Sequence, residues 1–213
     1  EDNPYTLQMA DFGFSDPNDT PPNQLQAVCI NTLPTVGSLS LQGAPVMAPQ
    51  CVPAVSIIAS GLVYLSAANA NGSPYTAFQF QVQDTGGTAN GGVDLDPTPD
   101  SITFNVTPVN DAPIGFDRTI TIGPCNETTY TFGPSDFVFS DPFDFPPNGL
   151  LGVMITQLPT ASDLTYGGLP AVSGQFVSLA DLQTGTLRFS FKAGTAPNAL
   201  DFFTYQVKDN GGT

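Results

Sequence analysis

The most constraining feature of this chain is an internal repeat. A shift that moves Phe12 to Phe137, or 125 positions, lays FGFSDPNDTPPNQL (12–25) over FVFSDPFDFPPNGL (137–150) and QVQDTGGT (81–88) over QVKDNGGT (206–213). About a third of the overlapped positions are identical, and no gap is needed. A period of this length exceeds that of solenoid repeats and is typical of a complete folding unit with its own core. We therefore expect an array of modules, which favours a spacer or binding role over a single active site.

The alignment of the two repeats predicts the boundaries of the modules. Residue 1 aligns with Asn126 and Thr213 with Thr88, so the segment 89–125 occurs once. We interpret the sequence as a piece of a longer array with domains at 1–113 and 114–213, the first without its opening strand and the second without its last strands. The alternative is that neighbouring subunits supply the missing strands, as in polymers built by strand donation.

The charge of the chain excludes several classes of partner. It carries 19 acidic against 4 basic residues, and every basic residue follows Pro113. Such a chain does not neutralise phosphates, so we expect no nucleic-acid binding and repulsion from anionic membranes. No apolar run approaches the length of a membrane span, so membrane insertion is not expected either. The 40% hydrophobic content, with 16 Phe, is that of a folding sequence and not of an acidic disordered tail.

The cysteines leave two interpretations open. Cys29 and Cys51 lie in consecutive strand-like segments of the first repeat, and Cys125 has no counterpart. Without a histidine or a zinc-type spacing, no structural zinc site is expected. Cys29 and Cys51 can form a disulfide in an oxidising compartment or remain two buried thiols.

Short alternating apolar runs, separated by Gly, Pro, Asn and Asp, predict β-strands along the whole chain. In YTAFQFQV, the side chains of Phe78, Phe80 and Val82 point to one face, which we assign to the core. Only 175–185 has room for a short turn of helix. The pattern therefore predicts an all-β fold with a Greek-key sandwich in each module.

The order of the motifs resembles that of cadherin-like repeats, both those of chondroitin sulfate proteoglycan type and those of large bacterial surface adhesins. The motifs are an acidic residue before Tyr5 and Thr6, then FSDPND, V-x-I-x-x-LP, SGLVYLSAANANG, FQFQVQDTGG and finally VTPVNDAP (106–113). The resemblance implies tandem Ig-like, cadherin-like β-sandwiches on a cell surface. It also implies calcium at the Asn-Asp-x-Pro linker, although the linker carries fewer ligand residues than that of vertebrate cadherins.

The acidic residues gather in turns, where a carboxylate can cap the backbone or bind a metal. Calcium takes six to eight oxygen ligands from carboxylates, amides and backbone carbonyls, which such loops supply. We favour calcium because acidic residues without bases repel one another unless cations screen them. The candidate ligands are Asp2, Asp16, Asp19, Asp84, Asp94, Asp96, Asp100, Asn110, Asp111, Glu127, Asp141, Asp144 and Asp209.

The ligands nearest the junction of the repeats are expected to matter most. They are Asn110 and Asp111 in the linker, Glu127 at the start of the second repeat and Asp209 in its DNGG turn. A metal held there would fix the dihedral angles of the linker and turn a flexible string into a rod.

These patterns favour a calcium-rigidified stalk or surface filament of an extracellular adhesin, whose partners are neighbouring repeats or identical subunits and, at the surface, glycans or proteins. An enzyme is not expected, because the chain has no histidine, no nucleophile motif and no phosphate loop. The alternatives are a subunit of a head-to-tail polymer formed by strand donation and a calcium-dependent carbohydrate-binding module. The chain has no Trp, so tyrosines would have to provide the stacking platform of such a module.

Overall fold

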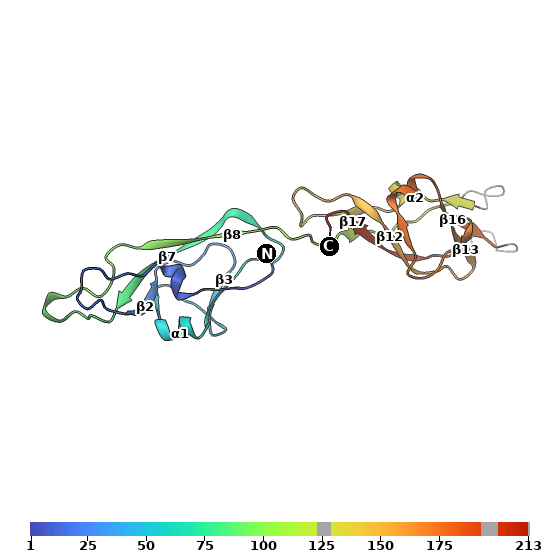
Figure 1. Ribbon diagram of the computed structural model, residues 1–213. Coiled ribbons are helices and arrows are strands. Elements are labelled where there is room, and N and C mark those ends of the chain that lie inside the picture. Colours follow the sequence, from blue (N-terminus) through green and yellow to red (C-terminus); the bar gives the residue numbers. More distant parts are fainter. Residues whose placement is uncertain (123–128, 193–199, 213) are drawn as a thin grey trace. The chain divides into compact units, whose positions relative to one another are not determined.

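The chain forms two compact units, Glu1–Val109 and Asn110–Thr213, called unit 1 and unit 2 below. The computed structural model describes residues 1–122, 129–192 and 200–212 (Figure 1). Antiparallel strands dominate both units and the helices are short, so the predicted all-β class is confirmed.

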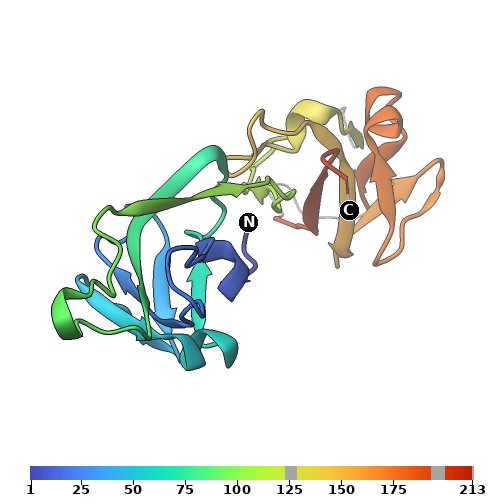
Figure 2. The same cartoon turned by 60° about the vertical axis from the view of Figure 1, so that its left-hand side comes forward.

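Two four-stranded antiparallel sheets make up unit 1 (Figures 1 and 2). One has the order β1 (Tyr5–Thr6), β6 (Leu62–Leu65), β3 (Ser38–Leu41), β4 (Ala44–Pro45). The other has the order β5 (Gln50–Pro53), β2 (Leu25–Ile30), β7 (Gly72–Asp84), β8 (Asp100–Val106). Helical turns connect the two sheets at η1 (Met9–Phe12) and α1 (Ala54–Ile58), and η2 (Ala89–Gly91) lies between β7 and β8 of the second sheet.

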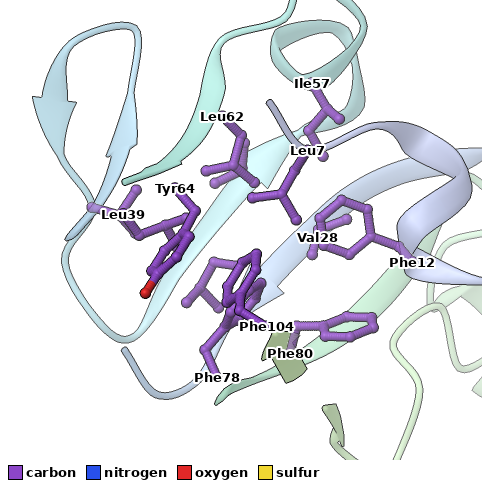
Figure 3. Close-up of a cluster of buried hydrophobic side chains, with 13 residues drawn as sticks. Leu7, Phe12, Val28, Leu39, Ile57, Leu62, Tyr64, Phe78, Phe80 and Phe104 are labelled. Carbon is purple, nitrogen blue, oxygen red and sulfur yellow. The ribbon is translucent and has the colours of Figure 1, made fainter. Parts of the chain in front are cut away.

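The two sheets of unit 1 enclose one hydrophobic core (Figure 3). The alternation in β7 buries Phe78 and Phe80 as predicted, while the intervening Gln79 is exposed. Phe104 of β8 stacks on Tyr64 of β6 with their ring centroids 3.8 Å apart, so the aromatic side chains join the two sheets. Burial raises the pKa of Tyr64 to about 12, and its hydroxyl donates a hydrogen bond to the carbonyl of Val36.

Unit 2 repeats most of these elements. One sheet has the order β10 (Thr129–Thr131), β16 (Leu187–Phe191), β13 (Ser162–Tyr166), β14 (Leu169–Pro170), and the other β15 (Phe176–Ser178), β12 (Leu150–Gln157), β17 (Thr204–Asp209). Two additional short strands, β9 (Ile114–Gly115) and β11 (Phe139–Ser140), pair with each other, and η3 (Pro134–Asp136) and α2 (Leu179–Gln183) are helical. The helix α2 lies within the segment where a helical turn was predicted, at the repeat position of α1.

Of the two interpretations of the cysteines in unit 1, the structure shows the disulfide. Cys29 of β2 and Cys51 of β5 are direct cross-strand partners and form a disulfide. Met154 and Phe176 occupy the same register in unit 2. Cys125 lies outside the described residues. A covalent link in one unit therefore replaces a side-chain pair in the other.

The cap of α2 gives a first testable difference between the units. The Ser178 hydroxyl accepts a hydrogen bond from the Asp181 amide and donates one to the Asp181 carboxylate, whereas the N-cap of α1 is Pro53, which makes no side-chain cap bond. Hydrogen bonds from Ser178 and Tyr166 lower the pKa of Asp181. We expect Ser178→Ala to reduce the free energy of unfolding of unit 2 by about 1 kcal/mol in urea titrations, because the cap bond is lost. An unfolding free energy of unit 2 that equals that of the parent would show that the cap contributes nothing.

Candidate functional site

Three segments of unit 2 that carry predicted ligands come together at one end of the unit. They are the linker after Val109, the loop 141–149 that follows β11, and the turn that follows β17. In the loop, Asp141 Oδ2 accepts a hydrogen bond of 2.5 Å from the Asn148 backbone amide, which closes the loop on itself. Asp144 Oδ2 accepts a bond of 3.1 Å from the Asp111 amide, which ties the loop to the linker.

The turn after β17 approaches the linker and the loop at Gly211. Asn148 Nδ2 donates to Asn110 Oδ1 over 2.9 Å, and the Cα of Gly211 lies so close to this pair that a Cβ would collide with both side chains. The Gly211 amide donates to Asp209 Oδ1 over 3.0 Å, which orients the carboxylate at the end of β17. Glycine is therefore required at position 211 for these side chains to approach one another.

Two acidic residues of this cluster are buried, and Asp111 and Asp144 are half-buried. Asp141 and Asp209 are each only 5% exposed. Asp141 Oδ1 is buried, and no hydrogen-bond donor reaches it from the described part of the chain. A buried carboxylate oxygen without a donor costs free energy, whereas a cation beside it would compensate the charge. We call Asn110, Asp111, Asp141, Asp144 and Asp209 the oxygen cluster.

Unit 1 contains the same arrangement without the linker contacts. Asp16 Oδ2 accepts a bond of 2.7 Å from the Asn23 backbone amide, as Asp141 does from Asn148. The side-chain amide of Asn23 turns instead to Asp19 Oδ2, 2.7 Å away. In the turn after β7, Asp84 Oδ1 accepts from the Gly86 amide over 2.6 Å. Asp16 and Asp84 are half-buried, so this cluster is the more open of the two.

The remaining described candidates are not brought into either cluster, except that Asp94 lies beside Asp84 because the Asp84 amide donates to its carbonyl. Their side chains accept hydrogen bonds from other groups of unit 1 or stand in solvent, as expected for Asp in turns. Asp2 accepts from the Asn69 amide, Asp94 from the Gln83 side chain and Asp96 from the Thr98 amide and hydroxyl, while Asp100 is exposed at the start of β8 and Glu127 lies outside the described residues.

Charged side chains alone do not make a metal site in either cluster. In the parts of the chain that the structure describes, no three carboxylate, cysteine or histidine side chains converge so as to hold a metal. An ion in the oxygen cluster would have to draw on the Asn110 amide oxygen and on backbone carbonyls as well as on Asp141 and Asp144. Calcium accepts such mixed oxygen ligands, which makes it the metal that these side chains suit.

Two kinds of residue in the clusters were not among the predicted ligands. Asn23 and Asn148 link the loop to its neighbours, and Gly86 and Gly211 allow the close approach. The repeat itself could have indicated them, because the asparagine and the glycine are each identical in the two repeats.

Comparisons with known proteins add no assignment. No family model, curated protein or solved structure matches the chain. The resemblance to cadherin-like repeats therefore rests on the motifs alone and stays a prediction. Among the described residues, no helix has the length and apolar character needed to cross a membrane.

Proposed function

We propose that this chain is a structural segment of an extracellular repeat protein, in which calcium bound by the oxygen cluster stiffens the connection between consecutive modules. The modules are proposed to be Greek-key, Ig-like sandwiches of the cadherin-like type. The segment acts as a stalk or surface filament and not as an enzyme.

The observation that carries the proposal is the buried Asp141 carboxylate, one of whose oxygens has no hydrogen-bond donor within the described residues. It lies in a loop that already binds the linker amide of Asp111 through Asp144. A cation here would neutralise Asp141 and hold the linker to the loop. The repetition of the same loop in unit 1 supports a role that belongs to the module rather than to one catalytic centre.

The linker is suited to stiffening because each unit already holds its own side of it. In unit 1, Glu1 Oε1 accepts a bond of 2.9 Å from the Val109 amide. In unit 2, Asp144 accepts from the Asp111 amide, and Asn110 Oδ1 is bound by Asn148. A ligand bound at the oxygen cluster is proposed to restrict the backbone dihedral angles of the segment that joins the two units.

Two features support an extracellular location. The Cys29–Cys51 disulfide is of the kind that persists in oxidising compartments. The net charge of −15 also suits a surface that is screened by free cations. The proposed partners are neighbouring repeats of the same protein or identical subunits, and surface glycans or proteins.

Isothermal titration calorimetry of the full chain with calcium and with magnesium tests the metal site directly. We expect saturable calcium binding whose tighter site Asp141→Asn abolishes, and much weaker magnesium binding, because magnesium demands a regular octahedral site. The matched variant is Asp16→Asn, the same change at the repeat position in unit 1, which should leave the tighter site intact. Absence of calcium binding, or a tighter site that Asp141→Asn retains, would refute the proposed site.

A second candidate is calcium-dependent glycan binding, for which the observation is an exposed aromatic side chain beside the oxygen cluster. Phe145, next to Asp144, is 91% exposed, and aromatic rings of this kind stack on apolar sugar faces. Retention of the chain on insoluble polysaccharides in calcium, lost in Phe145→Ala, would favour this function. Tyr64, in contrast, is buried in the core and is not available for stacking.

A further inference from the structure

The chain contains four asparagines that are followed directly by glycine, at positions 71, 90, 148 and 210. Such an asparagine can lose ammonia spontaneously when the backbone nitrogen of the next residue attacks its side-chain carbonyl carbon, and a glycine, which has no side chain, hinders this attack least. The attack requires the asparagine side chain and the next peptide group to turn towards each other. Hydrogen bonds that hold either of them therefore slow the reaction, since they must break first.

Two of these sites are held within unit 2. The side-chain amide of Asn148 donates to an asparagine oxygen of the linker over 2.9 Å, and the amide of Gly149, whose nitrogen would attack it, donates to Asn210 Oδ1 over 2.7 Å. The same bond fixes the Asn210 side chain, and the amide of Gly211, whose nitrogen would attack that side chain, donates to Asp209 Oδ1 over 3.0 Å. At both sites the asparagine side chain and the attacking nitrogen are thus held at once.

The two sites of unit 1 differ from each other. Asn71 is half-buried, and its side-chain amide donates to Glu1 Oε2 over 3.1 Å. Asn90 is exposed, and its side chain makes no hydrogen bond to any residue that the structure describes. Its backbone is left-handed, with a φ of 56° and a ψ of 27°, and Gly91 after it also has a positive φ of 84°. Of the four asparagines, Asn90 is therefore the one whose side chain no described residue holds.

The helical turn η2 forms the exposed tip of the loop between β7 and β8, which Figures 1 and 2 show in green at the end of unit 1. Both sides of this tip are anchored. The amide of the last residue of β7 donates to the carbonyl of Asp94 over 2.8 Å, and a Cβ on Gly92 would lie 2.7 Å from the carbonyl oxygen of Gly87. Residues 89–91 lie between these contacts and outside the core, so their conformation can change while the core of unit 1 stays as it is.

We propose that Asn90 is a site of spontaneous modification, at which the chain acquires an aspartate or an isoaspartate over time without an enzyme. The Gly91 nitrogen bonds to the side-chain carbonyl carbon of Asn90, the bond from that carbon to Nδ2 breaks, and ammonia leaves with the proton of the Gly91 amide. Water then opens the succinimide ring at either of its carbonyl carbons, which gives aspartate or, where the chain now runs through the side chain, isoaspartate. Each product adds a negative charge to unit 1, which contains no Lys or Arg to compensate it. The modification does not depend on calcium binding.

Mass spectrometry of the folded full chain, incubated in mildly alkaline buffer and sampled over time, tests the proposal. Digestion with chymotrypsin and chromatography of the peptides separate the four asparagines and distinguish aspartate from isoaspartate. We expect Asn90 to convert at least about tenfold faster than each of the other three, because those must first break hydrogen bonds. Anion-exchange chromatography of the intact chain should show a later-eluting species that coelutes with Asn90→Asp. The matched variant Asn90→Gln, which keeps the amide on a longer side chain, should not form this species in the same time.

The unfolded chain provides the comparison that isolates the effect of the fold. In guanidinium chloride all four asparagines have the same following residue and no hydrogen bonds to break, so their rates should become similar. Conversion of Asn71, Asn148 or Asn210 as fast as Asn90 in the folded chain would overturn the proposal. So would a folded chain in which Asn90 stays unmodified while the unfolded chain converts at all four sites, since the loop would then protect Asn90 as well as hydrogen bonds protect the others.

Discussion

Calcium is expected to raise the free energy of unfolding of unit 2 by about 2.7 kcal/mol at a free concentration 100 times its dissociation constant, and by about 4.1 kcal/mol at 1,000 times. For a unit of about 100 residues, the smaller value corresponds to a rise of the thermal midpoint of more than roughly 10 °C. The reason is that the ion binds the folded oxygen cluster, whereas the unfolded chain does not hold its ligands together. Differential scanning calorimetry of the full chain, in calcium and after chelation, measures the shift.

The variant Asp141→Asn distinguishes two roles of this side chain, that of a metal ligand and that of a cap of the loop. Its side chain keeps an oxygen to accept the Asn148 amide but loses the charge that lies buried at 5% exposure. We expect this variant to be at least as stable as the parent in chelator, because an uncompensated buried charge is removed, and to lose the stabilisation by calcium. If Asp141 only caps the loop, parent and variant will unfold at the same midpoint in both conditions.

Unit 1 provides an internal comparison for the same measurement. Its cluster has Asp16, Asp19 and Asp84, and Asp16 is more exposed than Asp141. Greater access of water to the carboxylates should weaken calcium binding. We therefore expect a smaller calcium shift for unit 1, and Asp16→Asn should leave the shift of unit 2 intact. A uniform shift of both units would indicate general screening of charge and not a site.

Much of the fold follows from local patterns that the sequence displays directly. The alternation of apolar and polar residues in β7 predicts that Phe78 and Phe80 lie on the buried face of the strand, because strand periodicity does not depend on distant residues. The helix α1 was missed because Ala54–Ile58 is a short apolar segment between strands, which pattern alone does not distinguish from a strand.

The site was predictable only in part, for a related reason. Asp141, Asp144 and Asp209 stand out as acidic turn residues, but so do Asp2 and Asp96, whose carboxylates accept hydrogen bonds from the Asn69 and Thr98 amides outside both clusters. Which turns meet depends on how strands are arranged, and no local pattern encodes it.

Removal of the Cys29–Cys51 disulfide is expected to reduce the free energy of unfolding of unit 1 by about 3 kcal/mol, because the sequence separation of 22 leaves a loop that is closed in the unfolded state only by this bond. The variant Cys29→Ala with Cys51→Ala, and the parent in reductant, should show the same loss in urea titrations. The dependence of the unfolding free energy on urea should also steepen, since an unfolded chain without the crosslink exposes more surface.

The repeat supplies a replacement that separates the crosslink from side-chain packing. Cys29→Met with Cys51→Phe installs the pair that unit 2 has at the same register, Met154 and Phe176. This variant should recover part of the packing between β2 and β5 but none of the constraint on the unfolded chain, so its stability should lie between the alanine variant and the oxidised parent and should not respond to reductant. The transition of unit 2, which contains no disulfide within its described residues, should stay unchanged throughout. If reductant leaves the transition of unit 1 unchanged in the parent, the disulfide does not stabilise unit 1, and the side chains of β2 and β5 alone hold these two strands together.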